Sequence, residues 1–322
     1  MTKARGLLEV ARDRMRTLHL SLRTEKAYLH WMRRYVKFHG KRHPREMGSA
    51  EVESFLTHLA VALRVSAATQ NQALHALLFL YRQVLELDLP WLENITRATK
   101  PKRLPVVLSP IEVRAVLAQL EGVSWLIASL LYGGGLRLTE ALRLRVNDLH
   151  LECGEVVVRG GKGGKDRMTV VPAALIDPLR SHLTRLSTRF ERDRKRGAPG
   201  VSLPVAVSHK YPSRAMLWGW HYVFPAESLC HDPYSGKTIR HHIHERVVQR
   251  AVQAAVRKAG ISQPATCHTF RHCFATHLLQ TGCDIRTVQE LLGHADVRTT
   301  MIYTHVLGKG ALGVVSPLDR SA

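Results

Sequence analysis

The chain has 322 residues, and its 47 Lys and Arg outnumber its 26 Asp and Glu, which gives a formal net charge of +21 at pH 7. Hydrophobic residues make up 45% of it, an ordinary fraction for a globular protein and too high for a disordered one. No run of about 18 apolar residues is present, which excludes a membrane-spanning helix, and the N-terminus lacks the apolar core of a signal peptide. The basic excess indicates a nucleic-acid-binding protein, and a basic ribosome-associated or membrane-surface protein is the alternative.

The cysteines indicate a reducing compartment. There are five, at positions 153, 230, 267, 273 and 283, an odd number with no C-x-x-C spacing. Disulfide bonds are rare in the cytosol, so scattered cysteines of this kind are typical of a cytosolic protein. We therefore expect a cytoplasmic protein with no membrane partner.

Residues 1–95 are expected to form four short helices. Apolar residues recur there at three-to-four spacing and make three stripes. The stripes comprise Ala27, Tyr28, Trp31, Tyr35 and Phe38, then Val52, Phe55, Leu56 and Leu59, then Ala73, Leu74, Leu77, Leu80, Tyr81 and Val84. Positions 1–45 contain 13 Lys and Arg against 3 acidic residues, so this bundle is expected to bind phosphates. For any single basic side chain there, a solvated surface position is the alternative.

A domain boundary is expected after this bundle. Residues 96–107 are too rich in proline and charge for a packed element, which predicts a linker. Ser109 can then cap the next helix, and Glu112 completes a capping box. We therefore predict an N-terminal helical, DNA-binding domain at 1–95, the linker at 96–107, and a second domain at 108–322.

A β-hairpin is expected in the second domain. The β-prone runs 156–158 and 168–171 are joined by the glycine-rich segment 160–166. That segment lacks the spacing of an ATP-binding phosphate loop, so a nucleotide site is not expected.

The rest of the second domain is expected to change from irregular to helical. Residues 188–245 contain several prolines and no clear period, so no regular element is expected there. Helices should follow at roughly 245–259, 267–280, 286–292 and 297–305, and Gly282 and Gly293 are placed to end two of them.

Several residues carry the chemistry that an attack on a phosphodiester needs, namely cations, hydrogen-bond donors and a nucleophile. They are Arg137, His268, Arg271, His294 and Tyr303. His268 and Arg271 are three residues apart and share one helix face, and an arginine presents a rigid fork that can bind two phosphate oxygens. Alone, Arg137 would be interpreted as a salt-bridge partner of Glu140. A zinc site is the alternative for Cys267, His268, His272, Cys273 and His277, although one helix cannot direct all of them at one point.

Together these residues resemble the tyrosine recombinase family of DNA strand exchangers, which includes phage integrases, Cre and the Xer proteins. The catalytic pattern of that family maps onto Arg137, Lys162, His268, Arg271, His294 and Tyr303, with Glu140 as a supporting residue. The resemblance implies a mainly α fold with a small β-sheet, an α+β catalytic domain within a two-domain C-shaped clamp. It also implies an enzyme that cleaves and rejoins DNA through a 3′-phosphotyrosine, with no cofactor, metal ion or ATP.

The resemblance implies a role for each of these residues. The two arginines would bind phosphate oxygens, His268 would donate a hydrogen bond and handle a proton, and the second histidine would support the opposite side. Tyr303 would be the nucleophile and Lys162 the general acid for the leaving 5′-oxygen. Lys165 and Arg167 compete for that last role and are otherwise expected to contact DNA.

Within the family, the chain is most similar to integron integrases. The segments 219–225, 240–242, 301–306 and 316–318 carry this likeness, and 188–245 is expected to be an insertion relative to plain Xer recombinases. The resemblance implies a pocket for a base that protrudes from a folded, single-stranded hairpin site, formed by Trp220, Pro233, His241 and His242. A minor hydrophobic cluster around Trp218 and Trp220 is the alternative.

The integron likeness further implies a homotetramer that holds two DNA sites and integrates and excises gene cassettes. It would work in the bacterial cytosol, associated with the nucleoid, and its segment 306–318 would pack into a neighbouring subunit. A plain Xer- or phage-type recombinase on duplex sites is the alternative within the family. A catalytically inactive DNA-binding protein is the alternative of another class.

Overall fold

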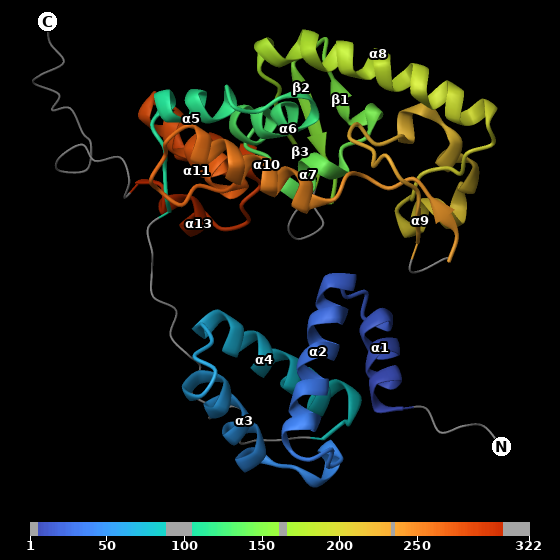
Figure 1. The fold of residues 1–322 in the computed structure, drawn as a ribbon, viewed down its shortest axis with the longest axis vertical. Coiled ribbons are helices and arrows are strands. Elements are labelled where there is room, and N and C mark those ends of the chain that lie inside the picture. Colours follow the sequence, from blue (N-terminus) through green and yellow to red (C-terminus); the bar gives the residue numbers. More distant parts are fainter. Residues whose placement is uncertain (1–5, 88–104, 161–165, 233–235, 305–322) are drawn as a thin grey trace, which may run out of the picture. The chain divides into compact units, whose positions relative to one another are not determined.

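The computed structural model describes residues 6–87, 105–160, 166–232 and 236–304 (Figure 1). The chain divides into two compact units, Met1–Arg103 and Leu104–Ala322. None of the described helices is both long and apolar enough to cross a membrane. Most of the predicted linker at 96–107 lies outside the described residues.

The described part of the first unit contains the four predicted helices. They are α1 (Leu7–Thr17), α2 (Leu22–Phe38), α3 (Ser49–Val61) and α4 (Ala67–Phe79). A 3₁₀ turn (Pro44–Glu46) precedes α3, and a π-helical turn (Leu80–Val84) extends α4. Ser21 and Ser66 start α2 and α4, because each side-chain oxygen accepts a backbone N–H from the first turn.

The predicted apolar stripes form the core of this unit. Most of their residues are buried, and the hydroxyls of Tyr35 and Tyr81 lie 2.8 Å apart inside it. Tyr81 donates in turn to the carbonyl of Met47 at 3.2 Å, so both buried phenols have a partner. Phe38 differs from the prediction, because it lies at the very end of α2 and is exposed.

The second unit is built around one central helix. α5 (Pro110–Leu117) begins at the predicted capping box, with the backbone N–H of Ser109 donating to Glu112 Oε2 at 2.7 Å. α6 (Gly122–Gly133) is apolar on nearly all sides, as expected of a helix inside a core. It contacts the helices α5, α7 (Leu138–Arg143), α8 (Ala173–Lys195), α10 (Glu245–Lys258) and α11 (Cys267–Gln280) (Figure 1).

The predicted hairpin is present in this unit. β2 (Glu155–Val158) and β3 (Arg167–Val170) pair antiparallel, with Val156 opposite Thr169. β1 (Leu149–His150) adds a third strand that no pattern predicts, because two residues are too few to show a period. Lys162 and Lys165, between β2 and β3, lie outside the described residues.

The segment 188–245 is more regular than the sequence predicts. α8 continues to Lys195, because the residues after 188 are good helix formers and Arg189 pairs with Asp193 across one turn at 4.0 Å. Beyond it lie one short helix, two 3₁₀ turns and a two-stranded sheet. These are α9 (Val205–Lys210), Pro212–Met216, Trp218–Trp220, and β4 (Cys230–His231) with β5 (Thr238–Ile239).

The C-terminal helices follow the prediction closely. α10, α11 and α12 (Ile285–Leu292) are confirmed, and α13 (Arg298–Met301) is shorter than the expected 297–305. Gly293 ends α12 in the left-handed conformation, with φ +63°, as the cap prediction requires. Gly282 has φ +91° directly after the C-cap of α11.

The turn between α6 and α7 packs too closely for side chains. A Cβ on Gly133 would lie 2.2 Å from Pro172 Cγ, and a Cβ on Gly135 would lie 2.4 Å from the ring of Phe274 on α11. Gly135 also has φ +65°, which residues with a Cβ rarely adopt. Glycine therefore allows the backbone of this turn to lie directly against α11.

We expect Gly135→Ala to lower the free energy of unfolding by about 2–5 kcal/mol, because left-handed strain adds to the clash with Phe274. Gly260→Ala is the matched control, since its φ is +69° but nothing lies within 4 Å of an added Cβ. That control should cost only the strain, about 1–2 kcal/mol. Urea unfolding of both variants is the measurement, and equal losses would mean that the close approach to α11 contributes nothing.

Candidate active site

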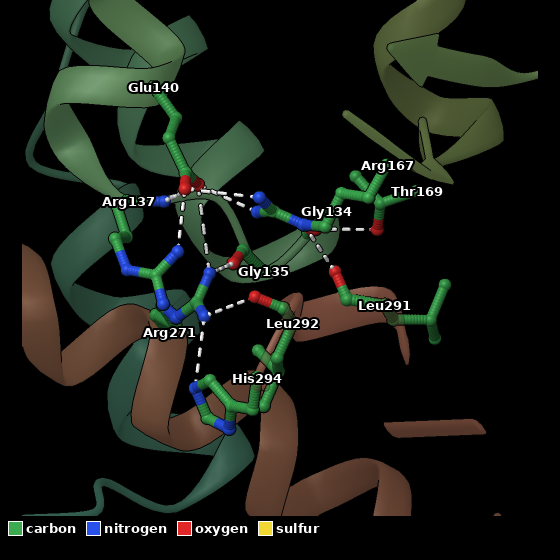
Figure 2. A network of polar contacts seen from close by, with 10 residues as sticks. All are labelled: Gly134, Gly135, Arg137, Glu140, Arg167, Thr169, Arg271, Leu291, Leu292 and His294. Carbon is green, nitrogen blue, oxygen red and sulfur yellow. Dashed lines mark hydrogen bonds and ion pairs between the residues drawn. The ribbon is translucent and has the colours of Figure 1, made fainter. Parts of the chain in front are cut away.

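One buried carboxylate gathers three arginines from separate parts of the second unit (Figure 2). Glu140 on α7 accepts Arg137 Nη1 at 2.6 Å, and Arg167 Nη1 and Nη2 at 3.0 and 2.6 Å. Arg271 Nη1 on α11 lies 3.7 Å from Glu140 Oε2. The side chain of Glu140 is 9% exposed, so these charges interact with little water between them.

Local sequence places Glu140 in this position. It is the third residue of α7, and its Oε2 accepts the backbone N–H of Arg137 at 2.8 Å, which caps the helix. Burial by itself would raise the pKa of Glu140, but the bonds from Arg167 and Arg137 outweigh it and hold the pKa at about 2. The carboxylate is therefore ionised at neutral pH and balances one of the three positive charges.

Arg271 is held by backbone carbonyls rather than by a close carboxylate. Nη1 donates to Gly135 O at 2.5 Å and Nη2 to Leu292 O at 2.6 Å, so this one side chain joins the glycine turn to the end of α12 (Figure 2). It is only 1% exposed, and burial together with the charge of Arg137 lowers the pKa of Arg271 to about 9. Arg271 remains a cation at neutral pH. Its positive charge is only partly balanced, because three arginines share the carboxylate of Glu140.

The side chain of Arg167 is buried, which differs from its predicted contact with DNA. The sequence predicts that it contacts DNA or competes with Lys162, but its side chain is 8% exposed and all three nitrogens are bonded. Nε donates to Leu291 O at 2.9 Å, and Gly293 lies so close that a Cβ there would be 2.7 Å from Arg167 Cδ. Such a guanidinium has almost no surface left for a phosphate. Arg167 therefore supports Glu140 and the end of α12.

His294 lies beside Arg271, and its bonds define its tautomer. Arg271 Nη2 is a donor at 3.2 Å from His294 Nε2, so Nε2 must be the accepting nitrogen. Nδ1 then carries the proton of a neutral ring and donates to Thr300 Oγ1 at 3.0 Å. His294 is thus in direct contact with the buried Arg271.

Tyr303 follows α13 and is buried, with 2% of its surface exposed. It packs among Phe274, Val288 and other apolar residues of α11 and α12, and its ring lies parallel to that of His294 with 6.4 Å between centroids. Burial raises the pKa of Tyr303, while the charges of Arg271 and Arg137 act in the opposite direction. The hydroxyl is therefore protonated in this DNA-free structure.

The hydroxyl of Tyr303 contacts His272, which the sequence suggested only as a ligand of the zinc alternative. His272 Nδ1 lies 3.0 Å from Tyr303 Oη. The exposed His268, one turn earlier on α11, packs its ring edge-on against His272 with 4.4 Å between centroids. The spacing of four residues between the two histidines was the available signal, because such residues share one helix face.

The structure thus brings most of the predicted residues together on neighbouring elements. Glu140 contacts both Arg137 and Arg271, and Arg271 contacts His294. Tyr303 stacks on His294, and His268 reaches Tyr303 through His272. Among the described residues, no three His, Cys, Asp or Glu side chains gather as metal ligands would, and His277 of the zinc alternative bonds Tyr132 instead. The arrangement fits an anion near two arginines and a nucleophile at its edge.

A sequence profile of the Phage integrase family matches residues 107–309, and one of the Phage integrase N-terminal SAM-like domain matches residues 7–91. The chain belongs to the phage integrase family. An "Integrase/recombinase" of Escherichia coli is 52% identical over 97% of this chain and 93% of its own length. Tyrosine recombinase XerA of Thermococcus kodakarensis is 31% identical over 88% of this chain and 84% of its own. Tyrosine recombinases of this family are enzymes that transfer DNA strands.

Solved structures support the fold. The XerH site-specific recombinase, in a post-cleavage complex with its difH substrate, has a TM-score of 0.61 at 21% identity and covers 94% of this chain and 82% of its own. The Tn1549 transposon integrase, in complex with transposon right end DNA, has a TM-score of 0.58 at 16% identity and covers 93% and 94%. The predicted fold class, mainly α with a small β-sheet, is confirmed.

The structure describes Trp220, His241 and His242 of the predicted base pocket. Pro233 lies outside the described residues. His241 and His242 lie 4.0 Å apart between ring centroids, and each ring lies 5.4 Å from that of Tyr222. Burial lowers the pKa of both histidines, to about 4 for His242, so the pair is uncharged at neutral pH.

Arg145 connects this histidine pair to Trp220. Its guanidinium carbon lies 4.6 Å from the ring centroid of Tyr222 and 5.4 Å from that of Trp220. It also donates to Trp220 O at 2.6 Å. Trp218 instead stacks on His221 and lies in tilted contact with Phe190, apart from the contacts of Trp220 with Arg145.

We expect Glu140→Gln to lower the free energy of unfolding by about 3 kcal/mol at pH 7, because it leaves three clustered arginines without their shared carboxylate. Glu112→Gln is the matched control, since Glu112 also caps a helix but pairs with no arginine among the described residues. Its loss should stay within about 1 kcal/mol.

The pH dependence of this difference gives a second readout. The folded pKa of Glu140 lies near 2, below its ordinary value of 4.5, so its contribution is complete above pH 4.5 and is lost as the pH falls towards 2. Urea unfolding of both proteins between pH 7 and pH 3 measures the gap. A gap that widens on acidification would contradict the assignment.

Proposed function

We propose that this recombinase cleaves and rejoins DNA at specific sites through a 3′-phosphotyrosine on Tyr303. The observation that carries the proposal is the cluster of Arg137 and Arg271 around Glu140, with His294 between Arg271 and the Tyr303 ring. A degenerate, merely DNA-binding site would have no reason to keep two arginines, a histidine and a tyrosine in mutual contact. The inactive alternative is therefore disfavoured.

Electrostatics favour an anion at this cluster. Three guanidinium groups share one carboxylate, which leaves two positive charges in excess within a poorly hydrated site. Arg137 is the partly exposed member, and among the described residues only its Nη1 is hydrogen-bonded. Its remaining fork suits the non-bridging oxygens of one phosphate, and the buried Arg271 adds its positive charge beside them. Charge that develops on those oxygens during attack is stabilised by the same groups.

The proposed reaction exchanges one phosphoester bond for another. Tyr303 Oη attacks the phosphorus, the bond to the 5′-oxygen breaks, and Lys162 gives that oxygen a proton. A 5′-hydroxyl then attacks the phosphotyrosine and restores both the phosphodiester and the tyrosine. Bond energy is kept in the covalent link, so the chemistry needs neither ATP nor a metal ion. The proposal includes Lys162 as the general acid and Lys165 as a contact to DNA, both from the segment between β2 and β3 in the sequence.

The proposed partner is DNA, bound by a homotetramer that holds two sites. The net charge of +21 supports DNA binding, as do the solved relatives that carry DNA. The proposed setting is the bacterial cytosol, in association with the nucleoid.

We further propose that the DNA sites are those of integron cassettes, folded as single-stranded hairpins with extruded bases. The partly exposed rings of Trp220, His241 and His242 support this, because they gather around the buried Tyr222 and Arg145. Aromatic rings beside an arginine are suited to stacking an unpaired base. The uncharged histidines are suited to lie against its flat face.

A Xer-type enzyme on duplex sites is the second candidate. The XerA relative, 31% identical to this chain, and the fold shared with XerH favour it. The two candidates share their chemistry and differ in the form of DNA that they prefer, which binding experiments can separate.

Tyr303→Phe should abolish covalent complex formation on a nicked suicide substrate and leave DNA affinity nearly unchanged, because it removes one oxygen and little packing. Tyr132→Phe is the matched control, since Tyr132 also bonds a histidine of α11, with its hydroxyl 3.0 Å from His277 Nδ1. The control should form the complex at the wild-type rate. A covalent complex from Tyr303→Phe would identify another nucleophile.

Trp220→Ala should weaken binding of a bottom-strand cassette hairpin with extruded bases by about 5- to 150-fold, the equivalent of about 1–3 kcal/mol of stacking. Binding of an ordinary duplex site should be spared. Tyr211→Ala is the matched control, because Tyr211 is an exposed ring of the same segment that also carries an arginine, with Arg214 at 4.1 Å. Equal wild-type affinity for bulged hairpin and paired duplex would favour the Xer-type candidate.

A further inference from the structure

The contact between His272 and Tyr303 involves Tyr303 Oη, the atom that attacks phosphorus in the proposed function. Tyr303 Oη lies 3.0 Å from His272 Nδ1, within the range of a good hydrogen bond. The pattern of catalytic residues on which the proposed function rests assigns nothing to His272. A nucleophilic hydroxyl next to an imidazole is the arrangement in which a general base acts.

The direction of this hydrogen bond follows from the state of each partner. Burial raises the pKa of Tyr303, so the phenol keeps its proton; among the described residues His272 Nδ1 is the only hydrogen-bond partner of Tyr303 Oη, so this buried proton is donated to it. Burial, with the nearby His268 and Arg271, lowers the pKa of His272 to about 4, so its ring is neutral at pH 7. A neutral imidazole accepts at one nitrogen only, and here that nitrogen is Nδ1. The proton of the phenol therefore already points at an unprotonated lone pair.

We propose that His272 is a further catalytic residue, which accepts the proton of Tyr303 during strand cleavage and returns it during rejoining; this rests on the proposed function of the site. In cleavage, the Oη–H bond breaks, the proton moves to Nδ1, Oη bonds to phosphorus and the 5′-oxygen leaves. In rejoining, the 5′-hydroxyl returns its proton to the acid that supplied it in cleavage, Lys162 in the proposed function, its oxygen bonds to phosphorus, the Oη–P bond breaks, and Nδ1–H gives the proton back to Oη. Atoms and charge balance over the cycle.

His268 and His272, on one face of α11, then have different roles. His268 is exposed and one turn away, with its ring centroid 4.4 Å from that of His272, so it is available to the phosphate. His272 is further inside and serves the tyrosine. Burial first, and then the charges of its neighbours, disfavour protonation of His272. A bound phosphate offsets those charges, so His272 becomes a stronger base when the substrate is present.

His272→Asn is the first test variant, because the amide oxygen can take the place of Nδ1 as acceptor but cannot hold the proton. We expect the rate of covalent complex formation on a nicked suicide substrate to fall by about 10²- to 10⁴-fold, with DNA affinity and thermal unfolding unchanged. His277→Asn is the matched control, since His277 on the same helix has its Nδ1 3.0 Å from the Tyr132 hydroxyl. It should cleave at the wild-type rate.

Two chemical substitutions, one in the nucleophile and one in the leaving group, distinguish a general base at His272 from a residue that only contacts Tyr303. Fluorotyrosine at position 303 has a more acidic phenol, so it should restore His272→Asn far more than it accelerates the wild type. A 5′-bridging phosphorothiolate, whose leaving sulfur needs no proton, should not restore this variant, because His272 acts on the nucleophile. If His272→Asn unfolds, His272→Ala rescued by added imidazole gives the same readout.

Three outcomes overturn the inference. Cleavage by His272→Asn as fast as or faster than the wild type would mean that His272 only restrains the tyrosine. Restoration by the phosphorothiolate would make it the acid for the leaving oxygen. Absence of any covalent complex from the wild-type protein would instead overturn the proposed function, and this inference with it.

Discussion

The candidate site depends on one buried carboxylate. Glu140 holds Arg137 and Arg167 by short hydrogen bonds and lies 3.7 Å from Arg271, so α7, β3 and α11 meet at a single side chain. Taking these charges out of water is unfavourable, and the attraction between them offsets that cost only while every partner stays in place. The same requirement fixes the positions of the arginines. Under the proposed function, such preorganisation increases the rate at which a phosphate bound beside the arginines reacts.

Backbone carbonyls supply the hydrogen-bond acceptors that one carboxylate cannot provide for three arginines. Arg271 binds Gly135 O and Leu292 O, and Arg167 binds Leu291 O, so both arginines tie the end of α12 to the rest of the site. Carbonyl dipoles orient a guanidinium without neutralising it, and the excess positive charge is preserved for an anion. Close approach of the backbone is possible because Gly135 and Gly293 have no Cβ to collide with Phe274 and Arg167.

Burial of the tyrosine has a consequence for control of the reaction. A phenol packed among apolar side chains and bonded to a neutral imidazole keeps its proton, and a protonated phenol is a weak nucleophile. Reactivity then requires an event that changes the electrostatics around Tyr303, and a phosphate at the arginines is such an event. Under the proposed function, activation of the nucleophile and recognition of the substrate are thereby the same interaction.

The sequence by itself determined the helices, the hairpin and the identity of the residues that meet in the site. Helical periodicity, the Ser109–Glu112 capping box and the glycine at 293 act over a few residues, so the chain reveals them without its fold. The spacing of His268, Arg271, His294 and Tyr303 was also sufficient to indicate phosphodiester chemistry. The predictions of the helices and the hairpin succeeded because each depends on contacts that are local, and the chemical roles of the site residues stay predictions.

Only the tertiary structure decided how those residues are paired. Arg167 lies on a strand 27 positions from Glu140 and was expected at the DNA, but the fold turns it inward onto the carboxylate. His272 was one of many histidines until the chain after α12 returned Tyr303 to its side, 31 positions on. The roles of Trp218 and Trp220 separated in the same way, since one packs on Phe190 and the other lies under Arg145. Such pairings depend on long-range packing and burial, which set both the partner and the charge state of a side chain and leave no periodic trace in the sequence.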